Sequence, residues 1–459
     1  MRWIKWLYPG MDIKRWLFLF TTGVIIAALG IALLFKYKFI HVVEKILSEL
    51  TYFSSATNYN VISLSVGILL LIIGIFLMVL ATRKSIHSIL EAIAPENNNH
   101  LLEKIFSKKR LARGPVITVI GGGTGLSVLL RGIKQITNNC TAVVTSADDG
   151  GSSGRLRQEF GIIPPGDCRN CLIALADTEP LMEKLMQYRF KGENQLAGHN
   201  FGNLFITAMH DIVGDMEGAL SATSEILKVR GRVIPSSVQP VELVAEMHDG
   251  KRVKGESSIS QAAGKIARLE ILPETPQATS SALKAIEEAD VIILGPGSLY
   301  TSVISNLLIP EIKQALLKSA AVKIYICNVM TQPGETDGFS AFAHVQKLLE
   351  YTDGVKFLDY VILNNQLDIN PELLEKYAAQ GAYPVLNDSD KIIELGIKVV
   401  PANLISQDNL IRHNSNRLAR TLIRLIYNLH LSNSIFNIFE YYFIKNIIKN
   451  LGSKNKEQT

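Results

Sequence analysis

Three glycine-rich stretches, each directly after an apolar run, carry the residues best suited to chemistry in this chain of 459 residues. The first stretch reads VITVIGGGTGLSVLLRGI (116–133), and the last reads DVIILGPGSLYTS (290–302). Glycine lets the backbone approach an anion closely. A helix that begins after such a turn offers unpaired N–H groups and the positive end of its dipole to a phosphate. We therefore expect both turns to bind phosphate, with a tight structural turn as the alternative.

The first glycine turn does not complete either of the common nucleotide-binding fingerprints. The position that needs a third glycine in the dinucleotide motif is Leu126, and no Gly-Lys-Ser/Thr sequence follows as in a P-loop. An NAD-dependent dehydrogenase is therefore the weakest of the interpretations considered.

The second glycine-rich stretch, TSADDGGSSGRLR (145–157), begins with a pair of acids. Carboxylates at the carboxyl end of a strand face the ligand crevice of an open α/β sheet. Asp148 and Asp149 could contact a ribose or hold Mg²⁺ beside phosphates. The glycines and the two serines that follow would add backbone N–H groups and hydroxyls. A solvated turn is the alternative interpretation.

Two further motifs precede apolar helices, PPGDCRN (164–170) and GHNFGN (198–203). Asp167 could contribute to the site or simply cap a helix. Arg169 stands at a helix start, where its charge opposes the dipole, and a residue placed against local preference favours a role in binding an anion. His199 could act as an acid, a base or a hydrogen-bond donor, although a lone histidine is often structural.

These motifs together define the candidate site. The candidate catalytic residues are Asp148, Asp149 and His199, and the first two are also possible Mg²⁺ ligands. The candidate ligand-binding residues are Gly121, Gly122, Gly123, Thr124, Gly125, Asp148, Asp149, Gly151, Ser152, Ser153, Asp167, Arg169, Asn170, His199, Asn200, Asn203, Gly295, Pro296, Gly297, Ser298, Thr301 and Ser302.

The elements that must position these residues alternate between strand and helix. Apolar, β-branched runs are found at 116–120, 141–146, 290–295, 323–329 and 360–365. Helical patterns follow at 125–136, 280–289, 311–320 and 339–351. This alternation predicts an α/β fold, with a Rossmann-like, mostly parallel sheet and helices on both faces. A DG turn between two strand-like runs predicts a small antiparallel insertion at about 229–272.

The N-terminal part of the chain has the pattern of a membrane hairpin. Residues 16–35 and 61–82 contain no charge, and each is long enough to cross a hydrocarbon core. We therefore expect a hairpin at 1–84, a linker at 85–113, the nucleotide-binding domain at 114–428 and an aromatic-rich amphipathic tail at 429–459. Lys and Arg gather before the first span and after the second, which predicts that both termini and the main domain are cytoplasmic.

The composition excludes some classes of function. Hydrophobic residues make up 47% of the chain, and the net charge of +5 is too small to indicate a nucleic-acid-binding protein. Of the four cysteines, Cys168 and Cys171 form a CxxC, which is weak evidence for zinc without a second pair of ligands. A reduced, cytoplasmic compartment is the simpler interpretation.

The motifs GGGTG, TSADDGGSSGRLR, GDCRN, GHNFGN and GPGSLYTS, in that order, resemble the bacterial gluconeogenesis-factor family. This family lies within the superfamily of the 2-phospho-L-lactate transferase, and the resemblance covers about residues 115–420. It implies a Rossmann-like core that binds a nucleotide sugar such as UDP-N-acetylglucosamine, or a dinucleotide. It also implies a link to carbon metabolism, cell shape and cell-wall synthesis.

The sequence leaves two hypotheses about function. The first is a membrane-tethered regulator that binds a nucleotide or nucleotide sugar and acts on a cell-wall or metabolic protein partner, with homo-oligomers possible. The second is a transferase that acts on a nucleotide-linked substrate with Mg²⁺. The run DDGGSSG departs from the transferase pattern, which favours the regulator.

Overall fold

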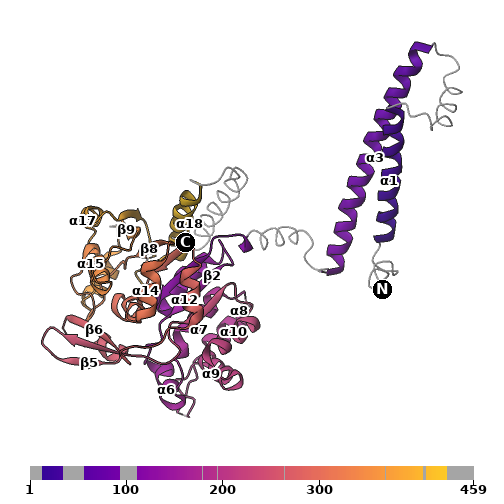
Figure 1. The fold of residues 1–459 in the computed structure, drawn as a ribbon. Helices are drawn as coiled ribbons and strands as arrows, with labels where there is room; N and C mark the ends of the chain where they lie inside the picture. The colour runs from indigo at the N-terminus through magenta and orange to yellow at the C-terminus, as the bar shows by residue number, and fades with distance from the viewer. Residues whose placement is uncertain are drawn as a thin grey trace. The chain divides into compact units, whose positions relative to one another are not determined.

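The computed structural model describes residues 13–34, 56–93, 111–177, 179–193, 195–262, 264–366, 368–406 and 410–431. The chain divides into two compact units, Met1–Lys109 and Arg110–Thr459 (Figure 1). The expected tail lies outside the described residues beyond Leu431, as does most of the expected linker.

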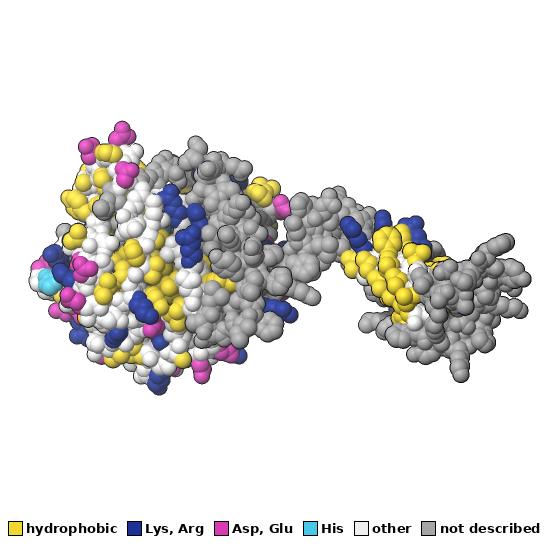
Figure 2. All heavy atoms as spheres, turned by 90° about the horizontal axis from the view of Figure 1, so that it is seen from above, with side chains coloured by type: hydrophobic (Ala, Val, Ile, Leu, Met, Phe, Trp, Pro, Cys, Tyr) yellow, Lys and Arg dark blue, Asp and Glu magenta, His cyan; other side chains and the backbone are white. Residues whose placement is uncertain are grey.

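The first unit contains two long apolar helices, α1 (Ile13–Leu34) and α3 (Ala56–Ile93), which pack against each other. Small residues allow the close approach, because a β-carbon added to Gly30 would lie 2.6 Å from the backbone nitrogen of Leu71. The outward side chains are apolar, with Phe18 75% exposed and Phe76 62% exposed. Figure 2 shows this apolar surface on the described part of the hairpin.

Both helices contain a segment long and apolar enough to cross a membrane, Arg15–Leu34 and Leu64–Ile86. These segments correspond to the two expected spans, with the second displaced by a few residues toward the C-terminus. Helix α3 continues to Ile93 and so extends into the range expected to be linker.

The second unit is built on a seven-stranded sheet in the order β10-β9-β8-β7-β1-β2-β3, and every pairing in it is parallel. Its strands are β1 (Ile117–Gly121), β2 (Cys140–Val144), β3 (Arg232–Pro235), β7 (Val291–Leu294), β8 (Val322–Ile326), β9 (Tyr360–Asn364) and β10 (Lys398–Ala402). The expected α/β fold is therefore confirmed. The five apolar runs form β1, β2, β7, β8 and β9.

Alternate residues of the strands feed two separate hydrophobic cores, as the period of two requires. On β1, Val119 belongs to one core and Ile120 to the other, and on β7 Ile293 and Leu294 divide in the same way. Helices therefore cover both faces of the sheet.

One core contains residues of α5 (Gly123–Ile133), α7 (Pro165–Leu175), α9 (Phe201–Val213), α10 (Met216–Ile226) and α18 (Ser415–Leu431). The other contains residues of α12 (Ser280–Glu287), the π-helix η3 (Leu299–Ile304), α13 (Ser305–Leu307), α14 (Pro310–Lys318), α15 (Ala341–Tyr351) and α17 (Ser389–Glu394). The remaining helices used below are α6 (Gly151–Phe160), α8 (Pro180–Gln187), α11 (Glu256–Gln261) and α16 (Pro371–Ala378).

A three-stranded antiparallel sheet, β5-β4-β6, forms the expected insertion. Its strands are β4 (Glu242–Met247), β5 (Arg252–Lys254) and β6 (Ile266–Leu272). Gly250 has a φ of 82° in the turn between β4 and β5, where the DG pair predicts a hairpin. The expected range of 229–272 is too wide, because β3 within it pairs with β2 of the main sheet. A two-stranded sheet of β11 (Ile405–Ser406) and β12 (Arg412–His413) completes the strands described.

The order of the main sheet reverses between β1 and β7. From β1 the chain adds β2 and β3 on one side, and from β7 it adds β8, β9 and β10 on the other. In open α/β sheets, ligands bind at the carboxyl ends of the strands at this reversal point. The first and last glycine turns follow β1 and β7, so the fold puts them at the expected crevice.

Candidate functional site

The glycine turns after β1 and β7 lie in direct contact. A β-carbon added to Gly125 would lie 2.1 Å from the carbonyl oxygen of Pro296, and one added to Gly122 would lie 2.4 Å from Oγ of Ser302. Glycine is required at both positions because any side chain would collide with the opposite turn. Two segments far apart in the chain therefore form one surface.

Each turn leads directly into a helix. Helix α5 begins at Gly123, and its N-cap residue Gly122 has an extended backbone and no side-chain cap. The N–H groups of its first turn therefore have no partner within the helix. The second turn leads into η3, where the Ser298 hydroxyl accepts a hydrogen bond from the N–H of Thr301 at 3.0 Å. The sequence predicts an ordinary helix here, whereas the structure has a π-helix, a form frequent at functional sites.

A cavity of about 420 Å³ opens between the two turns. The expected ligand-binding residues that line it are Thr124, Gly125, Asp167, Pro296, Gly297, Ser298, Thr301 and Ser302. Further polar residues that line it, and that the sequence analysis does not single out, are Glu256, Ser260, Asn328, Gln332, Arg412 and His413. The cavity therefore combines backbone N–H groups and hydroxyls with two carboxyl groups and an arginine.

Asp167 is a member of the site and does not cap its own helix. The N-cap residue of α7 is Pro164, and Asp167 follows in the first turn. Its carboxylate accepts a hydrogen bond from the N–H of Gly123, so it ties α7 to the first glycine turn. Burial, and next the charge of Asp148, raise the pKa of Asp167 to about 6. A carboxyl group with this pKa could exchange a proton near neutral pH.

The acid pair after β2 separates into two roles. Oδ1 of Asp148 accepts a hydrogen bond from the N–H of Gly150 at 2.9 Å, and burial raises the pKa of Asp148. Oδ1 of Asp149 instead accepts a hydrogen bond from the N–H of Ser257 at 2.9 Å, at the start of α11 in the insertion. Among the described residues, no group of three or more His, Cys, Asp and Glu side chains could hold a metal ion. Magnesium at Asp148 and Asp149 stays a prediction.

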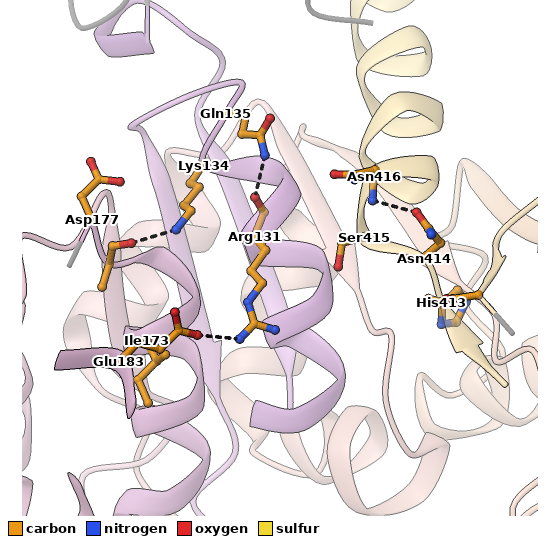
Figure 3. A pocket seen from close by; sticks show the side chains of 12 residues that line it. Arg131, Lys134, Gln135, Ile173, Asp177, Glu183, His413, Asn414, Ser415 and Asn416 are labelled. Atoms are coloured by element: carbon orange, nitrogen blue, oxygen red, sulfur yellow. Dashed lines mark hydrogen bonds and ion pairs between the residues drawn. The ribbon is translucent and has the colours of Figure 1, made fainter. Parts of the chain in front are cut away.

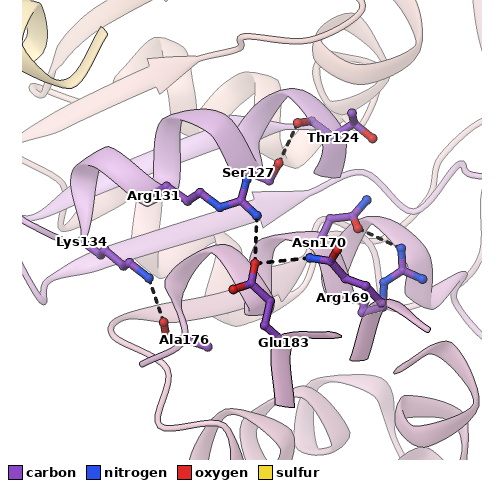
Figure 4. A network of polar contacts seen from close by, with 9 residues as sticks. Thr124, Ser127, Arg131, Lys134, Arg169, Asn170, Ala176 and Glu183 are labelled. Atoms are coloured by element: carbon purple, nitrogen blue, oxygen red, sulfur yellow. Dashed lines mark hydrogen bonds and ion pairs between the residues drawn. The ribbon is translucent and has the colours of Figure 1, made fainter. Parts of the chain in front are cut away.

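Arg169 is held by two asparagines that the sequence analysis names. Its Nη1 donates to Oδ1 of Asn203 at 2.7 Å, and its Nη2 donates to Oδ1 of Asn170 at 2.8 Å. Figure 4 shows the second of these bonds. Burial, and next the charge of Arg189, lower the pKa of Arg169 to about 10, which leaves the guanidinium charged at neutral pH. Its Nε is buried without a hydrogen-bond partner in the described part of the chain.

The remaining expected residues connect α6 with α9 and with the segment that leads into α9. Ser153 accepts a hydrogen bond from Nδ2 of Asn203 at 3.3 Å, and Asn200 caps α9. Oγ of Ser152 lies 3.3 Å from Nδ1 of His199. Burial, and next the charge of Arg155, lower the pKa of His199, which favours the neutral ring. Of this group, none is among the residues that line the cavity.

The other expected glycines lie at the edges of the site. Gly121 ends β1, and a β-carbon on Gly123 would lie 2.4 Å from Cα of Asp167. Gly151 begins α6 with a φ of 49°, and Gly295 follows β7 with a φ of 76°. These positions shape the turns.

Glu335, in the loop after β8, is a buried residue within the run MTQPGETDG (330–338), which follows an apolar strand and is expected to form a further wall of the crevice. Its Oε1 accepts a hydrogen bond from Oγ of Ser260 at 3.1 Å, and its Oε2 accepts one from Oγ of Ser298. It therefore ties the insertion to the second glycine turn. The run predicts a wall of the crevice, but it does not identify Glu335 as the residue that connects two parts of the site.

A second cavity, of about 700 Å³, lies beside the C-terminal half of α5 and the start of α18 (Figure 3). Arg131 donates to Glu183 at 3.3 Å, and Lys134 donates to the carbonyl of Ala176 at 2.8 Å (Figure 4). His413 borders both cavities. Arg131 and Lys134, which line the second cavity, already have protein partners. We therefore assign the candidate site to the cavity between the glycine turns.

Comparison with known proteins identifies relatives over most of the chain. A family model described as 2-phospho-L-lactate transferase CofD matches residues 117–405. A "Putative gluconeogenesis factor" of Nostoc sp. is 46% identical over 427 residues, 92% of each chain. The "Gluconeogenesis factor" of Bacillus subtilis is 46% identical over 317 residues, 69% of this chain and 99% of its own length.

Solved structures agree with this relationship. A crystal structure of a member of the UPF0052 family from Bacillus halodurans has a TM-score of 0.65 and 46% identity, and it covers 67% of this chain and 99% of its own. Nearly the whole of that protein therefore corresponds to about two thirds of this chain. The remaining third of this chain has no counterpart in it.

Proposed function

This chain belongs to the family of the 2-phospho-L-lactate transferase CofD and is related throughout to the gluconeogenesis factors, and from this we propose that it is a membrane-tethered regulator that binds a nucleotide or nucleotide sugar. The observation that carries the proposal is the contact between the turns after β1 and β7. Gly125 and Pro296 bring two helix starts to one cavity at the reversal point of the sheet. One phosphate of a diphosphate fits the uncapped N–H groups at the start of α5, and the second fits the polar side chains of Thr301 and Ser302 that line the same cavity.

The proposed tether is the hairpin of α1 and α3. Its glycine-lined interface and apolar outer faces are typical of helices that associate in lipid. The side chains of Arg15 and Lys84 both lie over the ring of Trp16, at 4.8 and 5.8 Å from its centre, so positive charge gathers at one end of the hairpin. The preference of such charges for the cytoplasmic side supports a cytoplasmic position for both ends and for the main domain.

The proposed role is to report the level of a sugar nucleotide to a metabolic or cell-wall protein. The names of the relatives link the family to gluconeogenesis. UDP-N-acetylglucosamine joins carbon metabolism to the synthesis of the cell wall, and from this we infer a role in cell shape. A strain without the gene is expected to grow normally on glycolytic carbon sources, and to grow poorly with altered shape on gluconeogenic ones.

Mass spectrometry and calorimetry test the binding directly. We expect the full chain, purified in detergent, to release a sugar nucleotide or dinucleotide on denaturation. After removal of that ligand, UDP-N-acetylglucosamine should bind and be recovered unchanged. Absence of bound nucleotide, together with no heat of binding with or without Mg²⁺, would contradict the proposal.

A transferase is the second candidate, and Asp167 is the observation that favours it. A buried carboxyl group with a pKa near 6, next to a phosphate-binding turn, is suited to accept a proton from an attacking hydroxyl. Release of UMP or UDP during incubation of the protein with UDP-N-acetylglucosamine and Mg²⁺ would favour this candidate over the regulator.

A further inference from the structure

The antiparallel insertion brings a carboxyl group to the cavity between the glycine turns. Glu256 is the first residue of α11, and it lines the cavity together with Asp167 and Thr301. Its Oε2 is buried and has no hydrogen-bond partner within the residues that the structure describes. Leaving a buried carboxyl oxygen unpaired is costly, so this atom favours a ligand that completes its hydrogen bonding.

Helix α11 is fixed to both sides of the site. At its start, the N–H of Ser257 donates to Asp149, the residue that follows β2. Near its end, Ser260 donates to Glu335, which also accepts a hydrogen bond from Ser298 in the second glycine turn. The position of Glu256 is therefore set by contacts with the loops after β2, β7 and β8.

The surroundings of Glu256 favour the neutral form of its carboxyl group. Burial, and next the charges of Asp167 and Asp148, raise the pKa of Glu256 well above its usual value, and a hydrogen bond with Thr301 partly offsets this. The neutral acid both donates and accepts a hydrogen bond. It also does not repel a diphosphate in the same cavity, as a carboxylate would.

We propose that Glu256 is the residue by which the site recognises a sugar hydroxyl attached to the diphosphate, so that a sugar-bearing diphosphate is preferred to a bare one. The inference rests on the proposed function, because it assumes a diphosphate at the glycine turns. A hydroxyl group matches a neutral carboxyl group in both directions of hydrogen bonding. The hydroxyl could belong to the ribose or to an outer sugar, and the experiment separates the two.

Calorimetry on the full chain in detergent, with inorganic pyrophosphate, UDP and UDP-N-acetylglucosamine as probes, tests this proposal. Glu256→Ala should weaken the binding of UDP-N-acetylglucosamine about tenfold or more, since it removes a buried hydrogen-bonding group. The same variant should keep its affinity for pyrophosphate within about twofold of the wild-type value. Glu256→Gln, which still donates and accepts, should retain most of the affinity. Ser258→Ala, at an exposed position of the same helix, is the matched control and should change nothing.

The outcomes distinguish the possible failures. Loss of affinity for UDP as well as for UDP-N-acetylglucosamine supports contact with the ribose, and loss for UDP-N-acetylglucosamine alone supports contact with the outer sugar. Equal weakening of the binding of all three probes would overturn the inference. Weaker binding of pyrophosphate only when Mg²⁺ is present would also overturn it, because Glu256 would then be a cation ligand. If the wild-type protein binds none of the probes, the proposed function fails first and the inference fails with it.

Discussion

Replacing Asp167 by asparagine tests whether a buried charge in the candidate site lowers the stability of the protein without ligand. The change keeps the shape of the side chain and the oxygen that accepts the N–H of Gly123, but it removes a buried charge. We therefore expect the variant to be more stable against unfolding than the wild type at pH 8.

The size of the effect follows from the pKa of Asp167. This pKa is raised from an ordinary value of 3.8 to about 6, and one pKa unit corresponds to about 1.4 kcal/mol. Ionised Asp167 therefore lowers the free energy of unfolding by about 3 kcal/mol at most, and by less where the cavity admits solvent. Because the pKa is higher in the folded state, wild-type stability falls as the pH rises from about 4 through about 6. The advantage of the asparagine variant should grow over that range and stay constant above it.

Pulse proteolysis in urea, at pH values from 4 to 8, measures this difference in the full chain. Tryptophan fluorescence is unsuitable because the three tryptophans all lie within residues 1–16. Asp211→Asn, an exposed position on α9, is the control and should show no pH-dependent gain. An Asp167→Asn variant that is less stable than the wild type at every pH, or whose difference does not change with pH, would refute the argument. Asp167 would then be stabilised as an anion by a partner.

Three further changes test the geometry of the site. Gly125→Ala should weaken binding of UDP-N-acetylglucosamine and lower the free energy of unfolding by about 1–3 kcal/mol, because the new β-carbon would lie 2.1 Å from the carbonyl oxygen of Pro296; calorimetry and urea unfolding measure both effects, and unchanged values would mean that the turns are not in contact. Asp149→Ala should weaken the binding of UDP-N-acetylglucosamine about fivefold and the binding of pyrophosphate much less. The change removes the acceptor of the Ser257 N–H, and losing such a cap costs about 1 kcal/mol. Equal loss of affinity for both ligands would place Asp149 at the phosphates. Deletion of residues 1–109 should give a protein that is soluble without detergent and keeps its affinity for nucleotide, because the second compact unit and the region matched by the family model both lie beyond residue 109. Loss of affinity would show that the hairpin contributes to the site.

The regular part of the fold could be predicted from local patterns. Buried parallel strands are continuous apolar runs, so 116–120 and 290–295 identify β1 and β7 directly. Strand β3 is different, because it is only four residues long and begins with an exposed arginine. It belongs to the main sheet through pairing with β2, a contact that a local pattern does not contain.

The site could be predicted only where a motif and a strand end coincide. The turns around Gly125 and Gly297 follow apolar strands, and the parallel sheet itself brings such ends together. The roles of Asp148 and Asp149 could not be separated in the sequence, since they depend on the insertion that donates Ser257 to one of them. Glu256 could not be predicted for the same reason, because packing alone brings α11 to the cavity. The run around Glu335 could be predicted only as a wall of the crevice, since its contact with Ser260 also depends on that packing.

A structure of the full chain with bound UDP-N-acetylglucosamine tests the central claim most directly. The account predicts the diphosphate between the two turns, within hydrogen-bond distance of the N–H of Gly125 and of the segment from Gly297 to Ser302. A diphosphate bound instead in the second cavity, beside Arg131 and Lys134, would contradict it.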